Sequence, residues 1–300
     1  MSHLHQLGRV SYGRAFAVGV GLNLTFVVVE VVFGLAAGSL ALIADAGHNL
    51  SDVLGLLLAW GASVLARRLP TARHTYGLRR TTVLAALLNG VLLLIAVGGI
   101  GWEAVRRFSE PAPVRATVVI VVAAVGIVIN TITALLFTAG RKGDLNIRGA
   151  FLHMAADAGV SAGVVAAGLG MAATGWSWLD PAISVAIVAV ILWGTWGLLR
   201  DSVNLALDAV PEGIEPEAVE AYLGDIPGIS GVHDLHIWGM STTDVALTAH
   251  LVKPALEDDD ALIASASLEL RQRFGIDHAT FQLERGRGGL PCHLAPADVV

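Results

Sequence analysis

The stretch Ser39–Asp52, SLALIADAGHNLSD, places ionisable side chains inside an apolar segment of the chain. Asp45, His48 and Asp52 stand at positions i, i+3 and i+7. In a helix this spacing puts all three side chains on one face. Ionisable groups inside a membrane helix are costly, and they usually face the protein interior or a water-filled cavity. The stretch therefore predicts a polar site within a membrane protein.

A second copy of the pattern lies in the later apolar segment Phe151–Val160, FLHMAADAGV. His153 and Asp157 stand there at i, i+4, in the same way as His48 and Asp52. If the two helices are neighbours, two imidazole nitrogens and two carboxylate oxygens can form a tetrahedral site, which zinc accepts. Such ligands are harder than thiolate and argue against copper(I). The alternative is local hydrogen bonding between helices, but two matched pairs favour a metal site.

The composition excludes an ordinary soluble protein. Of the 300 residues, 55% are hydrophobic and 15% are charged, and the mean hydropathy is +0.68. Charged residues make up about a quarter of a typical soluble domain. The net charge of −6 leaves no basic surplus for nucleic acid, and a single cysteine excludes an intramolecular disulfide. The sequence therefore predicts an α-helical protein embedded in a lipid bilayer.

Six segments are apolar and long enough to cross a bilayer, which takes about 20 residues. They cover, to within a few residues, 16–36, 40–65, 82–102, 114–138, 150–174 and 180–200. Most basic residues between them fall on one side of the membrane, with only Arg106, Arg107 and Arg115 on the other. Arginine and lysine concentrate in cytoplasmic loops. We therefore expect a multi-pass protein of the cell membrane with both termini in the cytoplasm.

After Arg200 the chain becomes mixed in character and predicts a soluble domain. Helices are predicted at 216–226 and 258–274, and β-strands at 232–240, 245–252 and 279–284. The order α-β-β-α-β indicates a two-layer α+β domain. About 80 residues are few for an independent core, which favours pairing with a second copy. The predicted domains are residues 1–207 in the membrane, 208–290 as the soluble domain and 291–300 as a flexible tail.

The chain resembles a known family, the cation diffusion facilitators, over nearly its whole length. The resemblance is carried by GSLALIADAGHNLSD at 38–52, HTYGLR at 74–79, NIRGAFLHMAAD at 146–157 and VHDLHIW at 232–238. It implies six spans, cytoplasmic termini, a ferredoxin-like cytoplasmic domain and a homodimer. Both metal-binding pairs of the family fall on matching positions of this sequence.

The resemblance also implies a function, which is the export of a divalent metal ion, most often zinc, in exchange for protons. The transport site would consist of His48, Asp52, His153 and Asp157. In the family, histidine at the first of these positions is associated with zinc, whereas aspartate there tends to admit cadmium as well. The residues support exchange independently, because metal needs neutral imidazole and ionised carboxylate, so that metal and protons compete.

A second metal site, with zinc as a regulatory ligand, is implied in the cytoplasmic domain. The family binds metal there through positions that match His233, His250 and Glu284. Gln282 stands where some members have a histidine, so the sequence does not decide whether a full two-metal site is present. Two tail residues, Cys292 and His293, either complete this site by folding back or belong to a solvated tail.

Three other polar residues each allow two interpretations. His74 matches a loop position where some family members bind a further metal ion, but the loop has no carboxylate near it. Glu30, in the first predicted span, is either a structural hydrogen-bond partner or part of a proton or metal route. Asp45 either lines the approach to the site or braces a packing contact.

Other classes of function fit less of the sequence. An intramembrane metalloenzyme needs an open coordination position and a separate general base. The motifs His-Glu-x-x-His and Gly-x-Ser-x-Gly do not occur, so we expect no enzyme. A non-transporting metal receptor would need an output module, and none is visible. A proton-coupled exporter of organic cations would use the same histidines and aspartates as a relay, and metal dependence would separate it from a metal transporter.

Overall fold

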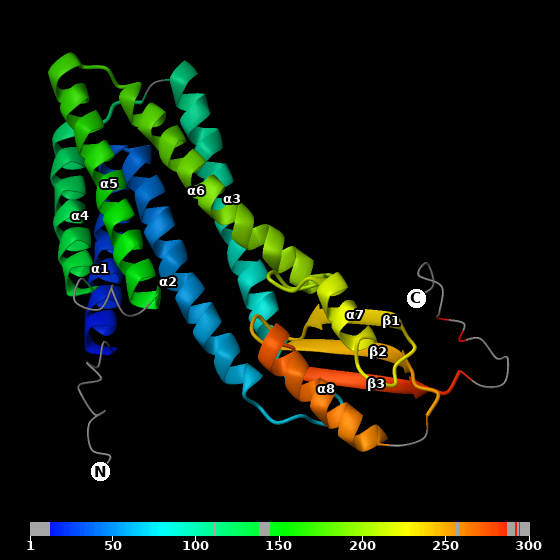
Figure 1. The fold of residues 1–300 in the computed structure, drawn as a ribbon. Helices are drawn as coiled ribbons and strands as arrows, with labels where there is room; N and C mark the ends of the chain where they lie inside the picture. Colours follow the sequence, from blue (N-terminus) through cyan, green and yellow to red (C-terminus); the bar gives the residue numbers. More distant parts are fainter. Residues whose placement is uncertain are drawn as a thin grey trace, which may run out of the picture. The chain divides into compact units, whose positions relative to one another are not determined.

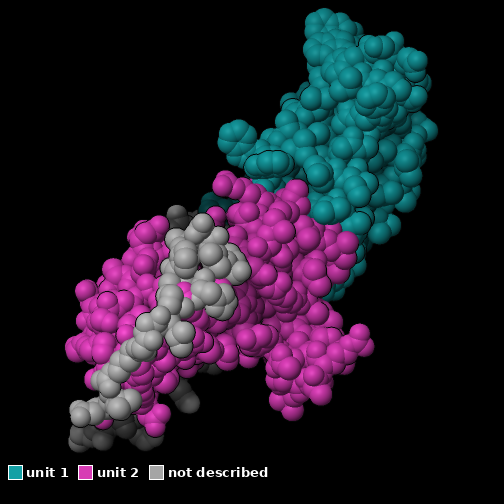
Figure 2. Space-filling model, turned by 90° about the vertical axis from the view of Figure 1, so that its right-hand side faces the viewer, with its two compact units in different colours: residues 1–57, 89–196 teal, residues 58–88, 197–300 magenta. Residues whose placement is uncertain are grey.

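A computed structural model describes residues 13–110, 112–137, 145–255 and 258–286, together with residues 292 and 294. The chain forms two compact units, which Figure 2 colours separately. The first unit comprises residues 1–57 and 89–196, and the second comprises residues 58–88 and 197–300.

Long helices make up most of the described chain as far as Ala206 (Figure 1). They are α1 (Gly13–Ala37), α2 (Leu40–Ala66), α3 (Thr81–Ser109), α4 (Ala116–Phe137), α5 (Leu145–Thr174) and α6 (Leu179–Ala206). Within the described residues, 5 helices, α2 to α6, are long and apolar enough to span a membrane, and α1 adds the shorter apolar helix Gly21–Ala37. The predicted α-helical membrane fold is confirmed.

Helix α3 runs further than its apolar segment predicted, because helical structure continues into charged sequence. α3 ends at Ser109, beyond the predicted end near residue 102. Its last turns are stabilised by ion pairs from Glu103 to Arg106 at 3.0 Å and to Arg107 at 3.3 Å. These pairs stand three and four residues apart on one helix face. Apolar periodicity alone does not detect such an extension.

Close helix packing in the first unit depends on glycine at the contacts. Gly126 on α4 lies against Phe26 on α1, where a Cβ atom would come within 2.6 Å of the phenyl ring. Gly168 on α5 faces Ile120 on α4, where a Cβ atom would come within 2.7 Å of the side chain. Small residues let membrane helices approach closely enough for van der Waals contact. The sequence pattern therefore brings α1, α4 and α5 side by side (Figure 1).

A buried carboxylate positions the start of α2. Asp180, in the first turn of α6, accepts hydrogen bonds from the Ser39 hydroxyl at 2.5 Å and from the Leu40 backbone N–H at 2.8 Å. Arg107 donates to the carbonyl oxygen of Gly38 in the preceding turn at 2.5 Å. The first N–H groups of a helix lack intrahelical partners, and a carboxylate satisfies them and interacts favourably with the helix dipole. This end of α2 is therefore held by residues far away in the chain.

The soluble domain lies in the second unit and has the predicted order of elements. It consists of α7 (Pro216–Gly224), β1 (Gly231–Gly239), β2 (Val245–Val252), α8 (Asp259–Phe274) and β3 (His278–Glu284). The sheet order is β1-β2-β3, with β1 antiparallel and β3 parallel to β2. Helices α7 and α8 contact each other and pack on the sheet (Figure 1). The predicted α+β class is confirmed.

The loop between α2 and α3 contacts the soluble domain within the second unit. Arg80 forms an ion pair with Asp208, and Arg79 lies 3.3 Å from Asp244. The Thr82 hydroxyl oxygen accepts a hydrogen bond from the backbone N–H of the β1–β2 turn residue 242 at 3.1 Å. Basic loop residues that the positive-inside pattern explains as membrane anchors therefore also bind the domain.

Candidate metal sites

The first candidate site is formed where α2 and α5 meet in the first unit. α2 carries His48 and Asp52 one helical turn apart, and α5 carries His153 and Asp157 with the same spacing. Because residues four apart lie on one helix face, each helix presents one imidazole and one carboxylate to the other. The structure brings all four predicted transport-site residues together.

Each imidazole of this four-residue site faces both carboxylates. Between the helices, His153 Nε2 lies 3.0 Å from Asp52 Oδ2, and His48 Nε2 lies 3.4 Å from Asp157 Oδ1. Within the helices, the distance is 3.9 Å from His48 Nε2 to Asp52 Oδ2 and 3.6 Å from His153 Nε2 to Asp157 Oδ2. Nitrogen and oxygen atoms therefore alternate around one centre.

The nitrogen–oxygen separations of this site are close to those around a tetrahedral ion. Zinc binds imidazole nitrogen and carboxylate oxygen at about 2.0–2.2 Å, so neighbouring ligand atoms of a tetrahedron lie about 3.3–3.6 Å apart. The four nitrogen–oxygen distances of the site range from 3.0 to 3.9 Å. No three of the four residues bring one ligand atom each within 4.8 Å of one another, because the remaining ligand-atom pairs lie further apart. Binding of a small divalent cation would therefore draw the side chains closer together.

Burial differs strongly among the four side chains. Asp157 is 1% exposed, whereas His153 is 40% exposed. The Oδ2 atom of Asp157 and the Nδ1 atom of His48 are buried without a hydrogen-bond partner among the described residues. A buried carboxylate oxygen without a donor is unfavourable, and a bound cation would remove that cost. The site is closed at Asp157 and accessible at His153.

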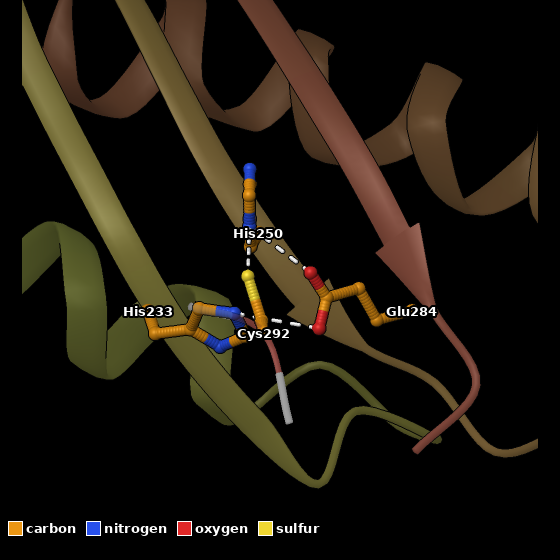
Figure 3. A group of neighbouring side chains, drawn as sticks. All are labelled: His233, His250, Glu284 and Cys292. Atoms are coloured by element: carbon orange, nitrogen blue, oxygen red, sulfur yellow. Dashed lines mark hydrogen bonds and ion pairs between the residues drawn. The ribbon is translucent and has the colours of Figure 1, made fainter. Parts of the chain in front are cut away.

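The second candidate site lies on the sheet of the soluble domain (Figure 3). His233 on β1 pairs in register with His250 on β2, and Glu284 ends the neighbouring strand β3. Cys292, which follows β3, points into the same group (Figure 3). One ligand atom from each of the four lies within 4.8 Å of the others. His293, the other predicted tail ligand, lies outside the described residues.

The contacts within this cluster of the soluble domain hold its ligand-type atoms close to one another. His250 Nδ1 lies 3.0 Å from Glu284 Oε1 and 3.6 Å from the Cys292 sulfur, and His233 Nε2 lies 3.4 Å from Glu284 Oε2. Burial raises the pKa of Glu284, but hydrogen bonds from Gln282 and Cys292 and the nearby imidazoles outweigh it and lower the pKa overall. Gln282 donates from Nε2 to Glu284 at 3.0 Å. It therefore holds a ligand-type side chain instead of supplying one.

Asp234 is a neighbour of the cluster that is not among the predicted ligands. Its carboxylate lies 3.3 Å from His250 Nε2 and 2.9 Å from His236 Nε2. A bulge between His233 and His236, with Asp234 at φ +51°, turns the side chain toward both rings. A carboxylate on the second nitrogen of a histidine orients that ring for metal binding. The available signal was the aspartate between two histidines in HDLH.

The remaining predicted ligand is His74, in the loop between α2 and α3. Its carbonyl oxygen accepts hydrogen bonds from the backbone N–H groups of Thr71 and Gly77, at 3.0 and 2.9 Å. In the part of the chain that the structure describes, the His74 ring makes no ion pair or side-chain hydrogen bond with a carboxylate or another histidine, and it is not in the group whose ligand atoms lie within 4.8 Å of one another. The structure therefore gives His74 a turn-forming backbone role and does not bring it to a second ligand.

Apolar helices that hold two histidines and two aspartates between them, followed by a small α+β domain, define a polytopic membrane protein. Residues 16–205 match a family model described as the cation efflux transmembrane domain, and residues 211–286 match the cytoplasmic domain of cation efflux proteins. The chain belongs to the cation efflux family, the cation diffusion facilitators. This is a family of membrane transporters and not of enzymes.

Curated relatives match over nearly the full length of the chain. The cation efflux system protein CzcD of Alcaligenes sp. (strain CT14) is 35% identical over 297 residues, which cover 99% of this chain and 92% of the relative. The zinc transporter ZitB of Escherichia coli (strain K12) is 36% identical, with 98% and 96% covered. A "Cadmium, cobalt and zinc/H(+)-K(+) antiporter" of Bacillus subtilis (strain 168) is 33% identical, with 95% and 92% covered.

Proposed function

We propose that this protein exports divalent metal ions, zinc foremost, from the cytoplasm in exchange for protons. The transported ion binds between α2 and α5, at His48, Asp52, His153 and Asp157. The observation that carries the proposal is the alternating arrangement of two imidazole nitrogens and two carboxylates, 3.0–3.9 Å apart. The names of the relatives, zinc transporters and an antiporter for cadmium, cobalt and zinc, support the same substrate class.

Zinc is favoured by the donor set. Two imidazoles and two carboxylates suit a tetrahedral, borderline ion, and harder ions such as magnesium prefer octahedral oxygen coordination. Cadmium and cobalt, which the name of one relative includes, can bind to the same imidazole and carboxylate ligands. We propose zinc as the main substrate and these ions as secondary ones.

Proton exchange follows from the chemistry of the ligands. Metal binds to neutral imidazole and ionised carboxylate, so that zinc binding expels protons and protonation expels zinc. The same four residues can therefore carry either zinc or protons. In the proposed cycle, zinc enters from the cytoplasm and protons enter from the opposite side.

The protein acts as a homodimer with both termini in the cytoplasm. The cytoplasmic domain of cation efflux proteins, matched by residues 211–286, supports dimerisation. The basic loop residues support the orientation. We also propose that His233, His250, Glu284 and Cys292 bind zinc as a regulatory ligand, with His293 as a further ligand. The support is the convergence of four ligand atoms within 4.8 Å.

The decisive experiment measures zinc uptake into proteoliposomes that contain the full-length protein and a zinc-sensitive dye. An imposed pH gradient should accelerate uptake, and Asp157→Ala should abolish it. Glu220→Gln, an exposed change on α7, serves as the matched control and should transport like the wild type. Uptake that ignores the pH gradient would exclude proton coupling. Uptake that survives in Asp157→Ala would exclude the proposed site.

A further inference from the structure

The two candidate metal sites differ in one ligand type, which is the thiol. The soluble-domain cluster consists of His233, His250, Glu284 and Cys292, with one ligand atom from each within 4.8 Å of the others. The site between α2 and α5, here called the membrane site, offers only imidazole nitrogen and carboxylate oxygen. Cys292 is the single cysteine of the chain. The soluble-domain cluster is therefore the one place where a thiol can bind a metal ion.

The cysteine sulfur lies at a suitable distance for a ligand of a tetrahedral ion. Sγ is 3.6 Å from His250 Nδ1, and Figure 3 shows the Cys292 side chain pointing toward His250 and Glu284. Zinc–sulfur bonds of about 2.3 Å and zinc–nitrogen bonds of about 2.0–2.1 Å place the two atoms about 3.6 Å apart around a tetrahedral ion. The sulfur and the His250 nitrogen can therefore bind one ion together.

The histidine on β1 gives a second, independent indication of a cation in the soluble-domain cluster. His233 Nε2 is buried and has no hydrogen-bond partner among the described residues, although Glu284 Oε2 lies 3.4 Å away. The rings of His233 and His250 are nearly perpendicular, with centroids 5.2 Å apart. A buried polar atom without a partner is unfavourable. An ion bound among the ligand atoms would remove that cost.

Two neighbouring side chains hold the ligands of the sheet from behind. Asp234 lies 3.3 Å from His250 Nε2, on the ring side opposite to the sulfur contact. Gln282 donates a hydrogen bond to Glu284 Oε1 at 3.0 Å. Such outer contacts orient metal ligands. The sheet therefore presents its nitrogen and oxygen ligands in a defined arrangement, to which Cys292 adds sulfur.

A thiolate changes which metal ions a site prefers. Thiolate is a soft ligand, whereas carboxylate is a hard one. Cadmium(II) is larger and more polarisable than zinc(II), so it gains more from binding to sulfur. Relative to the membrane site, the soluble-domain cluster has a thiol in place of one of the two carboxylates. The two sites should therefore rank zinc and cadmium differently.

We propose that the soluble-domain cluster binds soft divalent ions, cadmium foremost, through Cys292, and prefers cadmium over zinc more strongly than the membrane site does. This inference rests on the proposed function, in which the cluster binds a regulatory ion, and it names the class of ion. On binding, a sulfur–metal bond forms, and the thiol proton leaves to solvent. The bound ion thereby ties Cys292 to strands β1, β2 and β3.

The first test uses cobalt(II) as a coloured substitute for zinc in the purified, reduced full-length protein. A cobalt–thiolate bond gives a charge-transfer band in the near ultraviolet, at longer wavelength than the absorption of aromatic side chains. We expect this band in the wild type and its loss in Cys292→Ser, which nearly preserves side-chain size. Asp157→Ala should keep the band, because the membrane site has no sulfur. A wild type without the band, or a Cys292→Ser variant that keeps it, would overturn the inference.

The second test compares zinc and cadmium at each site. Loss of the cobalt band on addition of either ion gives the ratio of the two affinities at the soluble-domain cluster. Titration calorimetry of Cys292→Ser in a His250→Ala background gives the ratio at the membrane site. We expect the preference for cadmium to be at least about 10-fold larger at the cluster, the lower end of the effect of changes next to metal ligands. Equal ratios at the two sites would overturn the inference.

This inference and the proposed function can fail separately. Zinc uptake into proteoliposomes tests the transport function and does not depend on the cobalt band. If uptake follows the pH gradient and the band is absent, only the thiol-containing site is wrong. If the band and the cadmium preference are present but the pH gradient drives no uptake, the proposed transport fails and the metal preference of the cluster stands.

Discussion

His153 on α5 lies 3.0 Å from Asp52 on α2, measured from Nε2 to Oδ2. The two residues belong to different His-x-x-x-Asp pairs and stand 101 positions apart in the chain. Their contact joins the two pairs into one cluster of side chains. It also identifies the substitutions that test the site most directly.

Replacing Asp52 by asparagine should weaken zinc binding at the membrane site by more than about 100-fold, because even partners behind the metal ligands contribute about 10–100-fold. Titration calorimetry would measure this change in a His250→Ala background, which removes a ligand of the cluster in the soluble domain. Asparagine keeps the size of the side chain, so packing is preserved. Glu220→Gln should leave the affinity unchanged. An unaltered affinity in Asp52→Asn would contradict the assignment of that ligand.

Zinc affinity of the membrane site should fall when the pH is lowered from about 7.5 to about 6, since protons compete for imidazole in this range. The same titration at the two pH values would measure the change. The heat of binding should also depend on the ionisation enthalpy of the buffer. A pH-independent affinity would argue that zinc binds without displacing protons.

Zinc should protect Cys292 from alkylation at least severalfold, because a metal-bound thiolate is a poor nucleophile and its access is blocked. Cys292 is the single cysteine of the chain, so labelling of the full-length protein reports on one site. His250→Ala should remove the protection, and Asp157→Ala should retain it. Protection that is lost in Asp157→Ala but kept in His250→Ala would place the effect at the membrane site.

Asp180→Ala should destabilise the membrane unit, because the first N–H groups of α2 would lose their buried acceptor. Loss of a helix N-terminal cap costs about 0.5–2 kcal/mol. Thermal unfolding in detergent should therefore show a lower midpoint. Asp180→Asn keeps an acceptor oxygen and should fall in between. Equal midpoints for the wild type and Asp180→Ala would contradict this role.

Asp259, at the start of α8, should make stability of the soluble domain depend on pH. Hydrogen bonds from Arg285 and then Lys253 lower the pKa of Asp259 to about 2. An unfolded aspartate has a pKa of about 3.9, so the contribution is present above about pH 4 and is lost as the pH falls through about 2. Asp259→Asn should lower the unfolding midpoint at neutral pH, and the difference should shrink in acid.

The matched control for this prediction is Asp258→Asn, because Asp258 makes no side-chain cap hydrogen bond. Circular dichroism of the full-length protein during heating can follow both variants across the pH range. A difference between Asp259→Asn and the wild type that stays constant down to about pH 2 would show that the ion pairs are not its source.

The apolar spans and the pairing of ligands on each helix followed from local sequence. Six long apolar segments predicted the membrane helices, and the i, i+4 spacing of His153 and Asp157 put both on one face of α5. The strands of the soluble domain followed from short apolar runs bounded by turn residues. These features depend on backbone periodicity and on the preference of each side chain for lipid or water. Both are determined by local sequence.

Contacts between distant segments were decided by the tertiary structure alone. Three such contacts have no local pattern in the sequence: the cap of Asp180 on α2, the hydrogen bond from Asn49 to Glu30, and the orientation of Asp234 by a bulge in β1. Each contact joins groups whose separation depends on how helices or strands pack. The number of residues between them does not predict that separation. The sequence therefore determined which chemical groups each helix presents, and packing decided which of them meet.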